Sequence, residues 1–149
     1  MVRLITTVIL GLMLTLGGIG DTKGRMDNYQ CVRCGELVRG SDHTPADINC
    51  RAGGLHRWQS LGEVGQENYS CKRCDTWVEV NRRPTAVGCP IGGQHEWVHL
   101  GHVGPINYQC ERCHITITSN RTPKGPGCSQ GGNHQWVRLD STELKQGRQ

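Results

Sequence analysis

The residues of this 149-residue chain best suited to chemistry are its nine cysteines and a set of histidines at fixed distances from them. CxxC pairs begin at Cys31, Cys71 and Cys110, and each pair is followed by a third cysteine and then by a histidine. Zinc prefers thiolate and imidazole ligands, and four of them complete its tetrahedron. The spacing therefore predicts three Cys3His metal sites: Cys31, Cys34, Cys50 and His56; Cys71, Cys74, Cys89 and His95; and Cys110, Cys113, Cys128 and His134.

These sites belong to one sequence unit that occurs three times. Each copy has Asn-Tyr ahead of its CxxC, Gly-Gly between the third and fourth ligands, and a tryptophan two residues after the ligand histidine. The glycines suit a loop that must bend back with positive φ angles. No cysteine is left over. Four histidines have no counterpart in the other copies, and we interpret them as surface residues: His43, His99, His102 and His114.

Two other uses of the cysteines stay open. Residues 110–114 spell CxxCH, which is typical of c-type haem attachment, although the position of His114 holds Gly35 and Asp75 in the other copies. Disulfides suit an exported protein, but three sulfurs per copy cannot pair within that copy. Four protein ligands favour a closed structural zinc site over a catalytic one, which keeps a position open for water. We therefore expect three structural zinc ions per chain, no catalytic residue and no enzymatic activity.

The copies resemble zinc-knuckle and zinc-ribbon modules. CVRCGEL at residues 31–37 is nearest to the knuckle form because Gly35 follows its second cysteine, whereas Asp75 and His114 depart from that form. The resemblance covers residues 28–140 in three pieces. It implies small metal-stabilised units, and it does not specify a function.

Short β-strands are predicted to position the ligands. In the second copy, NYSC and TWVEV flank the CxxC with alternating, aromatic or β-branched residues, and HEWVHL forms a third such run. ITITS and HQWVRL repeat this pattern in the third copy. The sequence therefore predicts a small all-β fold of three tandem, three-stranded antiparallel modules in an elongated array. We call residues 28–65, 66–104 and 105–140 modules 1, 2 and 3.

Two repeated features bear on how the modules pack. Each repeated tryptophan lies two residues after a ligand histidine, which on a strand places both side chains on one face. We expect these tryptophans to pack beside the metal; the alternative is an exposed aromatic row that stacks on bases or sugars. SLGEVG at residues 60–65 and HLGHVG at residues 99–104 join the modules, and their leucines and valines are expected to pack one module against the next.

The two ends of the chain differ from the modules. Residues 1–20 carry one charge and an apolar run, which predicts a helical signal peptide. Cleavage would make the protein exported, to a periplasmic, cell-surface or extracellular location. The alternative is a short membrane anchor that stays attached. Residues 21–27 are interpreted as a linker and residues 141–149 as a polar tail.

The formal net charge of +4 argues only weakly for nucleic acid. Each zinc ion adds two positive charges and displaces three thiol protons, so three occupied sites lower the charge to about +1. Loss of Arg3 with the signal peptide would bring it near zero. We expect a structural or protein-interaction array with a protein partner or self-assembly, and no small-molecule substrate. A nucleic-acid-binding zinc-ribbon protein is the alternative, and a c-type haem electron-transfer protein is the third possibility.

Overall fold

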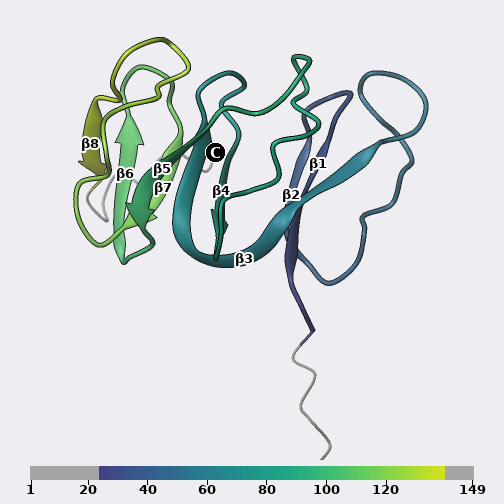
Figure 1. Ribbon diagram of the computed structural model, residues 1–149, viewed down its shortest axis with the longest axis horizontal. Coiled ribbons are helices and arrows are strands. Elements are labelled where there is room, and N and C mark those ends of the chain that lie inside the picture. The colour runs from purple at the N-terminus through teal and green to yellow at the C-terminus, as the bar shows by residue number, and fades with distance from the viewer. Residues whose placement is uncertain (1–23, 140–149) are drawn as a thin grey trace, which may run out of the picture.

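The computed structural model describes residues 24–139, which form eight β-strands and no helix (Figure 1). The strands are β1 (Asp27–Cys31), β2 (Leu37–Ser41), β3 (Trp58–Cys71), β4 (Trp77–Val80), β5 (Trp97–His102), β6 (Ile106–Cys110), β7 (Thr116–Ser119) and β8 (Trp136–Leu139). The all-β prediction is confirmed for this part of the chain. The predicted signal peptide at residues 1–20 and polar tail at 141–149 lie outside the described residues. Residues 24–139 include no helix long and apolar enough to cross a membrane.

In each module the strand that leads into the CxxC lies between two antiparallel partners. β1 lies between β2 and β3, the second half of β3 between β4 and β5, and β6 between β7 and β8. The first cysteine of each site is paired across the sheet with the repeated tryptophan, as in Cys31 with Trp58. This register brings the histidine that precedes the tryptophan close to the cysteine pair.

Modules 1 and 2 share a strand. β3 is 14 residues long; its first half pairs with β1 and its second half with β4 and β5. The boundary predicted between residues 65 and 66 therefore falls inside β3. At the next junction Pro105 stands where β3 has Gln66, and the chain leaves the sheet between β5 and β6. Proline has a fixed φ and no backbone N–H, so it is unfavourable inside a strand, and module 3 has a separate three-stranded sheet.

The modules lie side by side in chain order (Figure 1). At each junction a leucine enters the core of the following module, as the joint sequences predicted. Leu61 packs with Val78 and Val80, and Leu100 packs with Ile117; both leucines are almost fully buried. Each leucine lies where the strand register shifts by one residue, a β-bulge that turns its side chain toward the neighbouring module.

Asparagine side chains add a repeated hydrogen bond to this packing. Asn28 donates from Nδ2 to the carbonyl of Glu79 at 3.0 Å, and Asn68 donates to the carbonyl of Thr118 at 2.8 Å. Both asparagines are buried, so their amide groups need such partners. The interface between modules 1 and 2 therefore recurs between modules 2 and 3.

In modules 2 and 3, the glycine before the third cysteine lies close against the preceding module. Gly127 has φ 94°, and a Cβ there would lie 2.4 Å from Cγ2 of Val98 in module 2. In the part of the chain that the structure describes, no module packs against module 1 on this side, and module 1 carries the exposed Asn49 at this position with φ 62°. Asparagine tolerates this left-handed conformation when space allows. The difference between the copies thus reflects packing between modules.

We expect Gly127→Ala to destabilise the zinc-loaded protein by about 3 kcal/mol, because it adds both backbone strain and overpacking. The matched change Asn49→Ala keeps the same backbone strain without a neighbour and should cost about 1 kcal/mol. Urea denaturation followed by tryptophan fluorescence measures both values. Equal losses in the two variants would contradict the close approach of modules 2 and 3 at Gly127.

Candidate metal centres

The structure brings each predicted Cys3His set together. In all three sets the ligand atoms lie within 4.8 Å of one another. The Sγ atoms of Cys31 and Cys50 are 3.9 Å apart, and the second cysteine of each pair lies 3.4 to 3.6 Å from Nδ1 of its histidine. A zinc tetrahedron with ordinary bond lengths has S–S edges of about 3.8 Å and S–N edges of about 3.6 Å. The sets therefore have the dimensions of zinc sites.

The other uses of the cysteines fit less well. All nine cysteines are free, and the separation of Cys31 and Cys50 is well beyond the roughly 2.05 Å of a disulfide bond. Cys110 and Cys113 belong to the third Cys3His set, and His114 lies outside it. The remaining unrepeated histidines also lie outside the sets: His43 contacts Asp42, while His99 and His102 both contact the carboxylate of Glu67.

Tight turns aim the two thiols of each CxxC at one point. The first cysteine ends a central strand, and a backbone hydrogen bond closes the turn, such as the 2.9 Å bond from Gly35 N–H to the Cys31 carbonyl. The residue after the second cysteine has a positive φ in every copy: 76° for Gly35, 58° for Asp75 and 61° for His114. His114 therefore occupies a turn position that the other copies fill with glycine or aspartate.

A second turn carries the third ligand and leads to the histidine. Gly92 donates a backbone hydrogen bond to the carbonyl of Cys89 at 2.9 Å, and the other two copies repeat this bond at 2.8 and 2.9 Å. Both glycines of every Gly-Gly pair have positive φ angles, as in 93° for Gly92 and 71° for Gly93. This backbone geometry is the reason that all three copies have glycine here.

An arginine clamp, which the sequence analysis missed, ties the two ligand-bearing turns together. The residue before the second cysteine is arginine in every copy: Arg33, Arg73 and Arg112. Each guanidinium donates to carbonyl groups of the Gly-Gly loop at 2.5 to 3.4 Å: Ala52 and Leu55 in module 1, Gly92 and Gln94 in module 2, and Gln130, Gly131 and Asn133 in module 3. The repeated CxRC pattern was the signal that could have revealed it.

We expect Arg73→Ala to lower the zinc affinity of module 2 by about tenfold, because groups that hold the ligands in place affect metal binding at this scale. The matched control is Lys72→Ala, which removes the neighbouring positive charge. Lys72 contacts Glu96, and its side chain is half exposed and does not reach the loop. Competition with a chromogenic zinc chelator measures both affinities. A similar loss in the two variants would assign the effect to charge and not to the clamp.

The protein environment favours ionised sulfur at the first cysteine of each pair. Burial opposes ionisation of Cys31, but backbone N–H groups of Cys34, Arg57 and Arg33 outweigh it and lower the pKa to about 6. The Cys74 thiol, donating to Cys71, is the main cause that lowers the pKa of Cys71 to about 3, while the pKa of Cys74 is raised. One thiol of the pair thus ionises readily and the other keeps its proton, which zinc must displace.

The repeated tryptophans stack on the ligand histidines. The ring centroids are 4.6 Å apart for His56 and Trp58, 4.6 Å for His95 and Trp97, and 4.7 Å for His134 and Trp136. Each indole N–H also donates to a backbone carbonyl of its own module at 2.9 to 3.0 Å. Trp97 is only 5% exposed and the other two are half-buried. The tryptophans therefore pack beside the metal sites, and the exposed aromatic row is not observed.

The second nitrogen of each ligand histidine differs between the modules. Nδ1 faces the sulfurs, so Nε2 carries the proton when metal is bound. In module 1, Nε2 of His56 lies 3.7 Å from the carboxylate of Glu36. In the described residues, Nε2 of His95 and His134 is buried without a hydrogen-bond partner. Burial also lowers the pKa of His134, which favours the neutral imidazole that binds metal.

Comparisons with protein-family models, with curated proteins and with solved structures found no match for this chain. The class of protein is therefore inferred from the geometry of the three Cys3His clusters alone. The three clusters fit tandem zinc-binding modules, and each is suited to holding one metal ion, consistent with three zinc ions per chain.

Proposed function

We propose that this zinc-binding repeat protein is exported, has no enzymatic activity and acts as a protein-interaction array. Four protein ligands per site favour a structural role for zinc over a catalytic one. The observation that carries the interaction role is the interface between modules. Within residues 24–139 it is buried twice, and module 3 presents the corresponding face, which no other module of that range covers.

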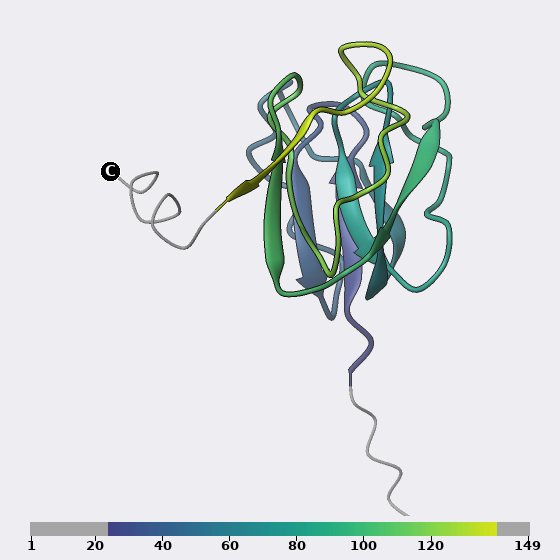
Figure 2. The ribbon, with the colours of Figure 1, turned by 90° about the vertical axis from the view of Figure 1, so that its left-hand side faces the viewer.

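The uncovered face lies on β6 and β8, at the end of the molecule turned toward the viewer in Figure 2. Leu139 has the sequence position of Leu61 and Leu100, but β8 pairs it directly with Asn107 without a bulge, and it is only half-buried. Val137 is 39% exposed, and Asn107 stands where the two junction asparagines donate to the following module. The corresponding faces of modules 1 and 2 each pack against the following β-module. An exposed apolar face of this kind on module 3 supports docking of a protein partner.

A second copy stacked head to tail fits this face less well than a different protein. In such a stack, module 1 of one copy would have to receive Leu139 of the other copy on the side that carries Asn49. Asn49 has the position that Gly88 and Gly127 have in the other modules. A Cβ at Gly88 would lie 2.5 Å from Cγ1 of Val32, so the same packing against module 1 would be obstructed. We therefore favour a distinct partner over self-assembly.

Photo-cross-linking tests this proposal. The protein is expressed in its native cell with a photoreactive amino acid in place of Val137. We expect it to cross-link one major exported protein, and the same probe at Val87, which is 58% exposed on a loop of module 2, should not. Leu139→Lys should abolish the cross-link while zinc content stays unchanged. Equal cross-linking from both positions, a product made only of this chain, or retention of the protein in the cytoplasm would contradict the proposal. Binding of DNA or RNA at physiological salt would instead favour the nucleic-acid alternative.

A further inference from the structure

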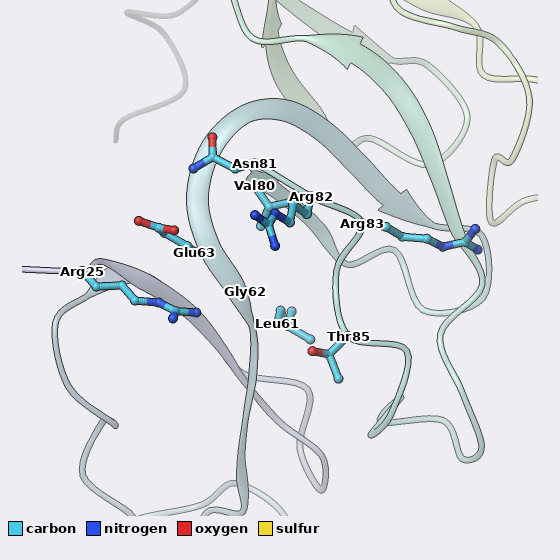
Figure 3. A pocket seen from close by; sticks show the side chains of 9 residues that line it. All are labelled: Arg25, Leu61, Gly62, Glu63, Val80, Asn81, Arg82, Arg83 and Thr85. Atoms are coloured by element: carbon cyan, nitrogen blue, oxygen red, sulfur yellow. The ribbon is translucent and has the colours of Figure 1, made fainter.

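A groove of about 410 Å³ lies at the junction of modules 1 and 2, beside the bend of β3 and apart from the zinc sites (Figure 3). The buried side chains of Leu61 and Val80 contribute to its floor. Its rim carries three arginines from two parts of the chain: Arg25, Arg82 and Arg83. The volume is within the range of small-ligand sites.

The loop that carries two of these arginines is fixed at both ends against β3. The backbone N–H of Asn81 donates to the Glu63 carbonyl at 3.4 Å, and its side chain donates to the Val64 carbonyl at 3.3 Å. At the other end of the loop, the backbone N–H of Thr85 donates to the Leu61 carbonyl at 3.2 Å. The arginines between these anchors therefore start from a defined backbone.

Positive charge exceeds negative charge around the groove. Arg82 is exposed and has no hydrogen bond or ion pair with any residue in the described range 24–139. Arg25 donates from Nε to Asp27 at 2.8 Å, and Arg83 reaches the Trp97 carbonyl at 3.4 Å. Glu63 supplies the only carboxylate of the lining, and Figure 3 shows it turned away from Arg82.

We propose that this groove binds a small multivalent oxyanion, a compact molecule with two or more phosphate or carboxylate groups. Arg25 and Arg82 lie on opposite sides of the β3 bend in Figure 3, so they suit two separate anionic groups of one ligand. Guanidinium groups bind such groups through charge-assisted, paired hydrogen bonds. The hydroxyl of Thr85 lines the same groove and offers a further donor. This site is independent of the interaction face on module 3.

Module 3 provides a matched control for the site. Arg121 is exposed and occupies the position of Arg82, and its loop is held by a corresponding bond from the Lys124 N–H to the Leu100 carbonyl at 2.9 Å. Thr122 stands in place of Arg83. Arg121→Ala therefore changes the net charge as Arg82→Ala does, without altering the groove.

Isothermal titration calorimetry of the zinc-loaded full chain tests the proposal, with pyrophosphate in one arm and citrate in the other. We expect at least one of these anions to bind. Arg25→Ala and Arg82→Ala should each weaken its binding by about tenfold, Arg82→Lys less, and Arg121→Ala less than about twofold. Zinc content and circular dichroism check that each variant is folded.

Absence of binding by both anions would overturn the proposal. So would equal weakening by Arg82→Ala and Arg121→Ala, because that result is expected of a diffuse charge effect. A single-stranded oligonucleotide that binds, and loses affinity equally in all the alanine variants, would instead assign these arginines to a nucleic-acid surface. A difference between phosphate and carboxylate ligands would identify the preferred oxyanion.

Discussion

Removal of zinc with a strong chelator is expected to unfold all three modules. The cores are small, and six of the nine cysteines are themselves among the buried residues. The chain has no phenylalanine and 21 glycines, so apolar burial alone has little capacity to offset chain entropy. A structural zinc ion supplies about 10–16 kcal/mol in small modules, which is comparable to the whole stability of an ordinary domain. We therefore expect β-structure and stacked tryptophan signals to disappear together.

Circular dichroism and tryptophan fluorescence measure this loss, with a reductant present so that disulfides cannot replace the metal. Addition of zinc should restore both signals. Because zinc must displace protons from thiols and imidazole, the amount of chelator needed should fall as the pH falls. A metal-free chain that keeps its β-structure and unfolds cooperatively on heating would contradict a structural role for zinc.

Replacement of Cys71 by serine is expected to affect more of the molecule than the same change at Cys110. Cys71 ends β3, the strand that modules 1 and 2 share, and module 2 also sends Leu100 into module 3. Each variant should lose one zinc ion, but Cys71→Ser should loosen parts of all three modules. Cys110→Ser should loosen mainly module 3, since β1 and β2 form no strand pairing with its sheet. The difference tests whether the modules are energetically connected.

Hydrogen exchange measured by mass spectrometry separates the two results. We expect amides of β1 to exchange at least tenfold faster in Cys71→Ser and to stay protected in Cys110→Ser. His99→Ala serves as the control that changes an unrepeated histidine of module 2, which is not a zinc ligand. Loss of protection confined to module 2 in Cys71→Ser would mean that the modules fold independently in spite of the shared strand.

The metal sites could be predicted from the sequence because the ligands of each site lie close together in the chain and the same motif occurs three times. The CxxC spacing, the Gly-Gly pairs and the ligand histidines lie within about 25 residues in each copy. Comparing the copies also identified His114 as a variable turn residue, although CxxCH alone suggests haem. The strands beside the ligands were predictable for the same reason, since their alternating runs flank the ligands directly.

Features that depend on contacts between distant residues could not be predicted in this way. β3 runs unbroken through Gln66 at one junction, whereas the chain leaves the sheet at Pro105 at the next, and β3 has different partners along its two halves. Asn49 looks like an ordinary variation until the neighbouring module is seen to require glycine. The groove similarly joins Arg25 with Arg82, which the sequence separates widely.

Native mass spectrometry with thiol counting tests most directly whether three structural zinc ions hold this fold. We predict three zinc ions per chain, with nine cysteines that react slowly with a thiol reagent before chelation and rapidly after it. A metal-free chain with few reactive thiols, or a chain that carries a haem with its Soret absorption band, would contradict this prediction.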